Sequence, residues 1–226
     1  MTQVNAKRQS LAIVIAMTFS MVLFLFSHGY CECYEGDGDT AQVSRTLNVF
    51  DRIMVDGAYT ITVKQGELPQ CLLRGDRNLL NRVMTQVENG QLIICNDDSL
   101  RMKQPLEIEL QLAKLIEFSA TGAHEITISD IEEDTFSLIL NGANRAKVSG
   151  DVGSLHLHLD GSSILEGENL HASSIDVVAT GTTSAQLSVE NLLMVRATGI
   201  SEVIYSGEPS SVIAELSGLA ELATAE

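Results

Sequence analysis

Six glycines recur at nearly even spacing through the second half of the chain. Successive members are 18 to 20 residues apart, and the set comprises Gly122, Gly142, Gly161, Gly181, Gly199 and Gly218. Each glycine follows a small polar residue and separates two short runs in which apolar and polar residues alternate. A fixed period of this length indicates a repeat architecture, in which each unit buries its apolar face against its neighbours.

Aligning the repeats on the glycine produces three apolar columns. They lie four before, two before and four after the glycine, and comprise Phe118, Leu138, Leu157, Val177, Val195 and Ala214; Ala120, Leu140, Leu159, Ala179, Ala197 and Leu216; and Ile126, Ala146, Leu165, Ala185, Val203 and Leu222. Alternation on both sides of a glycine corner indicates two short half-buried strands per repeat. The sequence therefore predicts an all-β fold, a right-handed parallel β-helix or β-solenoid of about six short two-strand coils over residues 116–226.

Outward-facing charges support this alignment. Opposite charges occupy the same position in neighbouring repeats in three cases: Glu125 with Arg145, Lys147 with Glu166, and Arg196 with Glu215. Such pairs across adjacent strands contribute about 0.2–1 kcal/mol each, so they support the register and add little stability.

The preceding segment, residues 43–115, breaks the period, and we expect it to form an irregular β cap within one domain spanning 43–226. Strands are expected at Leu47–Val55, Tyr59–Val63, Cys71–Arg74, Leu92–Cys95 and Leu106–Leu112, with a short helical stretch at Asn78–Met84. Asn89-Gly90 is a hairpin signal, and Asp56-Gly57-Ala58 resembles the corner of the repeat. Such a cap would cover the first open edge of the solenoid.

The N-terminus has the pattern of an export signal. Lys7 and Arg8 precede an uncharged apolar run from Leu11 to Phe26, and Ser27-His28-Gly29 supplies small residues for cleavage after residue 29. An uncleaved anchor and a lipoprotein attached at Cys31 are the alternatives. Residues 30–42 are expected to form a flexible acidic linker. The protein is thus predicted to be exported to the periplasm or cell surface, and to contact the membrane only through this segment if it stays uncleaved.

Charge and cysteine content limit the partners and the covalent structure. The formal net charge of −16 argues against a nucleic-acid partner and against adsorption to anionic lipid. Cys71 and Cys95 both fall in expected strands, and an exported protein permits either a disulfide between them or two buried thiols.

Several segments together resemble the head GIN domain family, which is often labelled an auto-transporter adhesin. They are the opening Phe50-Asp-Arg-Ile-Met-Val-Asp-Gly-Ala-Tyr, the Asn78-Leu segment, Gly90-Gln-Leu-Ile-Ile, the Ala120-Thr-Gly-Ala corner with its later copies, and Tyr205-Ser-Gly-Glu-Pro209. The resemblance runs from about Leu47 to Thr224 and implies an exported bacterial β-helical protein without established catalytic residues. Ile200 and Leu219 depart from it, since small residues follow the other corner glycines. They indicate either an apolar interaction ridge or packing under the chain terminus.

Residues suited to chemistry are few. His156, His158 and Asp176 would lie together on one outer face and are weak metal candidates, while solvated surface side chains are the favoured interpretation. The acidic group Asp130–Asp134 lacks the spacing of a calcium loop and is expected to be a solvated connection between coils. No cofactor and no catalytic residue is predicted.

The sequence favours a non-enzymatic, adhesin-like binding or display module of the cell envelope, with an unknown protein or glycan partner. A glycan-active β-helix enzyme is one alternative, although the short coils leave little room for a cleft. The other is an envelope scaffold, a homo-oligomer that associates end to end through the open ends of the solenoid.

Overall fold

The computed structural model describes residues 33–96 and 99–225. The expected signal segment, residues 1–29, and Cys31 lie outside the described residues. The chain divides into two compact units, Met1–Cys33 and Tyr34–Glu226, and nearly all of the described residues belong to the second. In the described part of the chain, no helix has both the length and the apolar character needed to cross a membrane.

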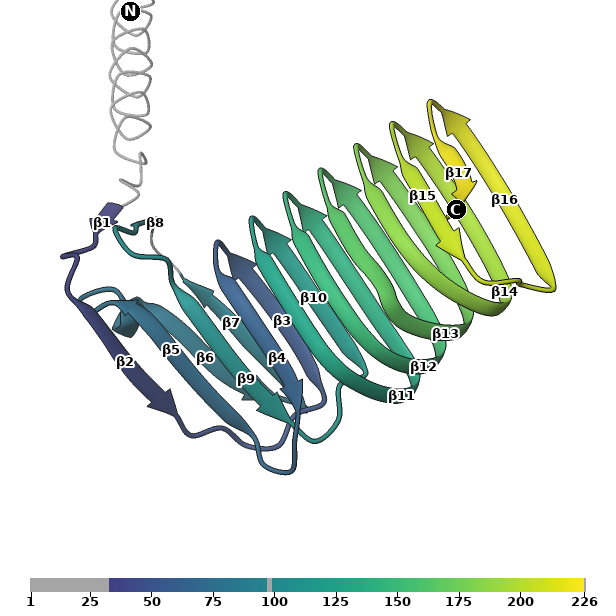
Figure 1. Ribbon diagram of the computed structural model, residues 1–226. Coiled ribbons are helices and arrows are strands. Elements are labelled where there is room, and N and C mark those ends of the chain that lie inside the picture. The colour runs from purple at the N-terminus through teal and green to yellow at the C-terminus, as the bar shows by residue number, and fades with distance from the viewer. Residues whose placement is uncertain (1–32, 97–98, 226) are drawn as a thin grey trace, which may run out of the picture. The chain divides into compact units, whose positions relative to one another are not determined.

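The second unit is built almost entirely of strands (Figure 1). The described residues before the long coil strands, which we call the entry segment, form eleven short elements. They are β1 (Cys33–Glu35), β2 (Thr40–Arg45), β3 (Arg52–Gly57), β4 (Thr60–Gln65), β5 (Gln70–Asp76), the 3-10 turn η1 (Leu80–Arg82), β6 (Val83–Glu88), β7 (Gln91–Asn96), β8 (Ser99–Arg101), β9 (Glu107–Leu112) and β10 (Glu117–Gly122). The coils follow as β11 (Glu125–Gly142), β12 (Arg145–Gly161), β13 (Ile164–Gly181), β14 (Ser184–Gly199), β15 (Glu202–Ser206), β16 (Ser211–Gly218) and β17 (Glu221–Thr224).

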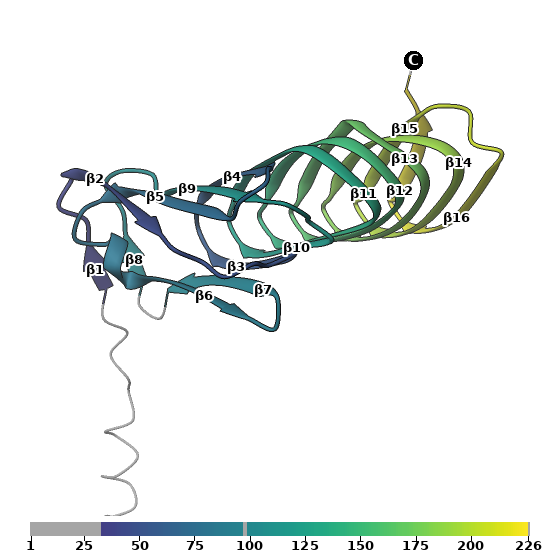
Figure 2. The same cartoon turned by 90° about the horizontal axis from the view of Figure 1, so that it is seen from below.

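Stacked parallel coils confirm the predicted β-solenoid, which has two faces (Figures 1 and 2). The β3 face consists of β3, β10, the second halves of β11 to β14, and β16. The β4 face consists of β4, the first halves of β11 to β14, β15 and β17. Both faces send alternate side chains into one core between them.

Each coil differs from the expected pair of short strands, because one long strand runs from glycine corner to glycine corner. In β11 to β14 the parallel pairing continues around a second corner, where the register shifts between Ile128 and Ile131, between Lys147 and Ser149, and between Gly167 and His171. Such bulges bend a strand without ending it. A single strand therefore contributes to both faces.

The glycine corners stack in register. Gly57 is paired with Gly122 and starts the stack, as the resemblance of Asp56-Gly57-Ala58 to the repeat corner indicated. Gly181 illustrates why the position excludes side chains. Its φ is +99°, and an added Cβ would lie 2.4 Å from the carbonyl oxygen of Gly161 in the coil below. Both the backbone conformation and the close approach of the coils require glycine there.

The core follows the three predicted columns and is aliphatic apart from a few aromatic rings. Their members are almost fully buried up to Val195, Ala197 and Val203. Phe118 and Phe136 are fully buried among them. In the last described coil the pattern changes, because Leu216 is 41% exposed and none of the described strands covers it.

A fourth buried column, polar in character, lines the inside of the glycine corners. It lies two residues after each glycine and comprises His124, Asn144, Ser163, Thr183 and Ser201. His124, Asn144, Ser163 and Ser201 each bond the carbonyl oxygen of the residue three positions earlier. Neighbouring coils are joined as well, since the His124 N–H donates to Asn144 Oδ1 and the Tyr59 N–H donates to His124 Nδ1. We call this column the corner ladder.

His124 makes the corner ladder sensitive to pH. Because Nδ1 accepts a hydrogen bond from Tyr59, the proton of the neutral ring lies on Nε2, which donates to the Thr121 carbonyl. Burial lowers the pKa of His124 below its ordinary value, and the bond to Thr121 offsets this only in part. A protonated ring would lose the acceptor that the Tyr59 N–H requires.

We therefore expect stability to fall as the pH drops from about 6.5 toward the lowered pKa of His124, because the unfolded chain takes up a proton there that the folded protein does not. The His124→Asn variant should keep both hydrogen bonds, as Asn144 does, and lose this dependence. Chemical unfolding of both proteins between pH 7 and pH 4.5 tests this. Parallel curves across that range would contradict the assignment.

The entry segment is more ordered at its start than the flexible linker expected over residues 30–42. β1 pairs with β8, and β2 pairs antiparallel with β5. The cause is Asp76, which is 1% exposed and accepts hydrogen bonds from the N–H groups of Gly38, Lys103 and Gln104. The expected helical stretch at Asn78–Met84 is reduced to η1, and β6 begins at Val83. The β6–β7 hairpin turns at Asn89 and Gly90 as predicted, both with positive φ.

Among the described residues, no disulfide joins Cys71 and Cys95. Cys71 lies on β5, which belongs with β9 to the β4 side, whereas Cys95 lies on β7, which pairs with β3. The two strands thus continue different faces of the solenoid. Cys71 is buried, and burial raises the pKa of its thiol to about 11. A thiol of this kind is a core side chain and a poor nucleophile.

Candidate functional site

The predicted metal candidates lie on the flat β3 face, and their carboxylate is already engaged. His156 on β12 is directly beside Asp176 on β13, as the alignment predicted, and His158 follows two residues later on the same exposed side. Both oxygens of Asp176, however, accept from Arg196 Nη2, at 2.9 and 3.2 Å. Among the residues that the structure describes, no three histidine, cysteine or acidic side chains gather in a metal-binding arrangement.

The ion pairs on the outer faces also differ from the three expected ones. The strand register is as predicted, but Arg145 bonds Glu166 at 2.9 Å and Arg196 bonds Asp176. Arg145 reaches a carboxylate in the following coil, and Arg196 reaches one in the preceding coil. Neither carboxylate lies directly opposite its arginine in the strand register. The acidic residues expected opposite them, Glu125 and Glu215, are exposed.

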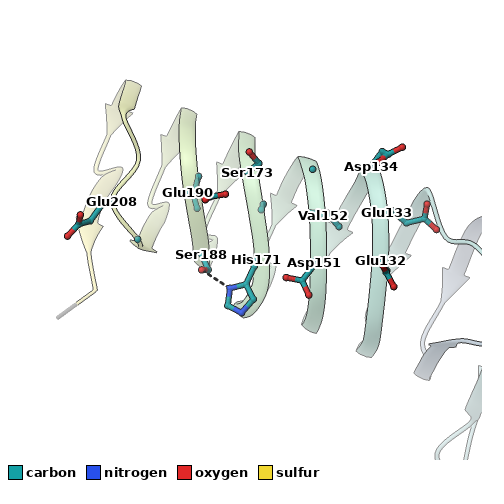
Figure 3. Close-up of a pocket in the computed structure, with 14 residues that line it drawn as sticks. Glu132, Glu133, Asp134, Asp151, Val152, His171, Ser173, Ser188, Glu190 and Glu208 are labelled. Atoms are coloured by element: carbon teal, nitrogen blue, oxygen red, sulfur yellow. Dashed lines mark hydrogen bonds between the residues drawn. The ribbon is translucent and has the colours of Figure 1, made fainter.

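A concave surface of the coils lies along the second corner, opposite the glycine stack. It is a groove of about 820 Å³ that crosses β11, β12, β13, β14 and the link from β15 to β16 (Figure 3). Four coil-to-coil steps of about 4.8 Å give it a length of about 19 Å. The backbone of residues 152, 172, 189 and 207 forms its floor, because the side chains of Val152, Ala172 and Val189 belong to the core and are less than a tenth exposed.

Two polar rims border this floor because side chains alternate across it. The first, the Asp151 rim, consists of Glu132, Asp151, His171 and Ser188, which are paired in register from coil to coil. The His171 Nδ1 and Ser188 Oγ atoms are 3.1 Å apart (Figure 3). The second, the Glu190 rim, consists of Asp134, Ser173, Glu190 and Glu208.

Glu133 closes the groove at the entry end and takes a structural role. Its side chain is only 8% exposed, and its Oε1 accepts from Gln65 Nε2 at 3.0 Å and from the Leu115 N–H at 3.1 Å. Lys114 Nζ lies 3.7 Å from the other oxygen. The side-chain Oε1 of Gln65 in turn accepts from the Glu132 N–H. These bonds fix the first turn of the groove to the cap.

The chemistry of the groove is that of an acidic channel. Apart from His171, its described lining residues include no basic side chain, and none is aromatic. Asp151 lies on a strand that is paired with β11 on one side and β13 on the other, so its backbone is held in place before any ligand arrives. Such a surface favours cationic and hydrogen-bond-donating groups on an extended chain.

Sequence reasoning found only one part of this groove. The acidic group Asp130–Asp134 was expected to be a solvated connection, and it forms instead the second corner of β11. Asp151, His171, Glu190 and Glu208 were not connected with it. Their distances from the preceding glycine are nine or ten residues, and the bulges that cause this variation hide the column in a glycine-based alignment.

Comparison with protein families identifies the kind of domain. The family model described as "Putative auto-transporter adhesin, head GIN domain" matches residues 49–209, which is most of the chain. The chain belongs to the head GIN domain family. The resemblance seen in the sequence is thereby confirmed, and the match ends before β16 and β17.

Solved structures share the fold of this head GIN domain at low sequence identity. A putative adhesin from Bacteroides fragilis is 16% identical with a TM-score of 0.71, over 85% of this chain and 100% of that one. A putative adhesin from Parabacteroides merdae and a putative lipid binding protein from Parabacteroides distasonis are each 16% identical. Their TM-scores are 0.59 and 0.54, over 86% of this chain and 100% of theirs. A comparison with curated proteins finds no match.

Proposed function

We propose that this head GIN domain is a non-enzymatic, exported binding module that displays its second-corner groove at the cell envelope. The groove binds an extended chain that carries cationic groups, either a basic protein segment or an amino sugar polymer. Membership of an adhesin-like family supports a binding role. The observation that carries the proposal is the pair of acidic rims along one continuous groove.

The solenoid suits such a role because its rims are rigid before binding. In the Asp151 rim, each residue is paired in register with its neighbour in the next coil by the parallel pairing of β11, β12, β13 and β14. A ligand that lies along the floor meets a new carboxylate at most coils without having to order a loop. Little conformational entropy is lost on the protein side, so modest contacts suffice for binding.

A direct test measures binding of two probes that span about 19 Å, the length expected for five stacked strands. One is a peptide of alternating lysine and serine, the other an oligomer of glucosamine. Their controls are the same peptide with glutamate in place of lysine, and the N-acetylated oligomer, which lacks the charge. We expect at least one cationic probe to bind, with affinity falling as salt rises, and neither control to bind.

Variants then locate the site. The double variant Asp151→Asn with Glu190→Gln removes one carboxylate from each rim and should weaken binding about tenfold or more, because hydrogen bonds to charged groups contribute about 1.5–3 kcal/mol. Asp160→Asn removes an exposed carboxylate at the glycine corner, away from the groove, and should leave binding unchanged. Equal effects of the two changes would contradict the proposed site.

The same probes separate the rival function, a glycan-active enzyme. Such an enzyme would use two carboxylates of the groove as acid and as base or nucleophile. Release of shorter products from the glucosamine or N-acetylglucosamine oligomer, lost in the Asp151→Asn variant, would replace the binding proposal with an enzymatic one. We expect the oligomers to remain intact.

A further inference from the structure

The C-terminal end of the solenoid exposes what every other coil buries. β16 places Val212, Ala214 and Leu216 directly over the buried Leu193, Val195 and Ala197 of β14, so these side chains point into the core. Val212 and Leu216 are nevertheless 41% exposed, because none of the described coils lies above them. Ile200 and Leu219 beside them, on the glycine corner, are 59% and 72% exposed, so they are not packed under the chain terminus.

This end also offers two unpaired strand edges at once, one on each face (Figure 1). Within the described residues, β16 is hydrogen-bonded only to β14, and β17 only to β15. The opposite end differs. It finishes with antiparallel strands, β2 on β5 and β6 on β7, and its core side chains Ala41, Val43 and Val87 are partly buried. Among the described residues, therefore, core side chains and unpaired strand edges are exposed together only at the C-terminal end.

We propose that a second copy of this chain docks on the C-terminal end, about a twofold axis that passes through both faces. β16 then pairs antiparallel with β16 of the second copy, and β17 pairs with β17. A foreign peptide strand would extend one face and leave the other edge and the apolar side chains open. A second copy covers both edges and the exposed core together, and the symmetric contact closes as a dimer.

We expect the register that places the two exposed inward side chains of β16, Val212 and Leu216, opposite each other. Directly opposed residues in an antiparallel pair point to the same side, so inward residues must oppose inward ones. Centring the axis on Ala214 places Val212 opposite Leu216 of the second copy, and Ile213 opposite Glu215 of the second copy. Shifting the axis to Glu215 would oppose two carboxylates, which is destabilising. The Ala214 register avoids that repulsion in a strongly acidic protein.

The test uses sedimentation equilibrium on residues 34–226, which form a compact unit with their own core. We expect a monomer–dimer equilibrium. Ile213→Glu opposes glutamate to Glu215 twice per dimer and should weaken it, whereas Ile213→Lys creates two attractive pairs and should strengthen it. The dissociation constants of the two variants should differ about tenfold or more.

Two controls separate an effect on the dimer contact from an effect on folding or on charge alone. Ile213 is 53% exposed on the outer side of β16, so neither variant should lower the melting temperature of the dilute monomer. Val49→Glu, at a 77% exposed position of the entry segment, should leave the dimer unchanged. A monomer at all concentrations, equal effects of glutamate and lysine at position 213, or open-ended assemblies instead of dimers would each overturn the proposal.

Discussion

Replacing Gly181 with alanine is expected to destabilise the protein by at least about 4 kcal/mol. The φ of +99° alone costs a residue with a side chain about 1–2 kcal/mol. The larger effect comes from the coil below, because the new Cβ would lie 2.4 Å from the Gly161 carbonyl oxygen. That oxygen is part of the backbone and also accepts the Thr182 N–H, so it cannot move aside cheaply. Urea unfolding of residues 34–226 measures the loss.

Gly38 provides a matched control for the two causes. Its φ is +81°, but an added Cβ would contact only Lys103 Cδ, at 3.6 Å. Gly38→Ala should therefore cost only the backbone strain, about 1–2 kcal/mol. If both alanine variants lost the same stability, the contact between stacked corners would have no energetic role and the explanation of the period would be wrong.

The second large effect is expected at Asp76, where replacement by asparagine should cost about 2–3 kcal/mol. The carboxylate is buried, with Oδ1 2.8 Å from the Gly38 N–H nitrogen and Oδ2 2.8 and 3.1 Å from those of Lys103 and Gln104. The side-chain NH2 group of an asparagine would face one or two of these three N–H donors, so at least one N–H would lose its acceptor. Chemical unfolding gives the loss, and hydrogen exchange should show faster exchange at Gly38, Lys103 or Gln104.

Asp76 also predicts a dependence on pH. Burial by itself raises the pKa of this carboxyl, but the N–H groups of Gln104, Lys103 and Gly38 outweigh burial and hold the pKa below its ordinary value. The contribution of the carboxylate is therefore complete above the unfolded pKa of about 3.9 and is lost as the pH falls through the folded pKa. The stability difference between the protein and the Asp76→Asn variant should shrink in that range.

Asp39 serves as the comparison for Asp76. Its carboxylate bonds Arg77 Nε at 2.9 Å, but both side chains are more than half exposed. Exposed ion pairs contribute about 0–1 kcal/mol, so Asp39→Asn should have a small effect that salt reduces further. A loss as large as that of the Asp76 variant would show that the entry segment is held by its surface charges and not by the buried carboxylate.

The solenoid could be predicted from the sequence because few residue types fit its glycine corner. Glycine at each corner, a small polar residue before it and apolar residues at fixed distances around it all follow from coils about 4.8 Å apart. The register that places Lys147 beside Glu166 and His156 beside Asp176 is confirmed by the strand pairing. The corner ladder has an equally constant position, two residues after the glycine, but it was not predicted, because its members range from histidine to serine and share only their polarity.

The groove and the cap were not predictable in the same way. At the second corner the chain bulges differently in each coil, so the column from Glu132 through Asp151 to His171 has no fixed distance from the glycine. The choice of ion-pair partner is also decided by side-chain reach, since Arg196 bonds Asp176 and not the Glu215 beside it. In the entry segment, the order of Gly38 depends on Asp76, a contact across 38 residues.

Hydrogen–deuterium exchange on residues 34–226, with and without the cationic probe that binds, tests the binding account most directly. We expect slower exchange confined to the second corner, at residues 132–134, 151–153, 171–173 and 188–190, where the groove crosses successive coils. The flat β3 face around His156 should exchange at the same rate in both samples. Protection on that face, or at β16 alone, with none at the second corner would contradict the proposal that the groove is the binding site.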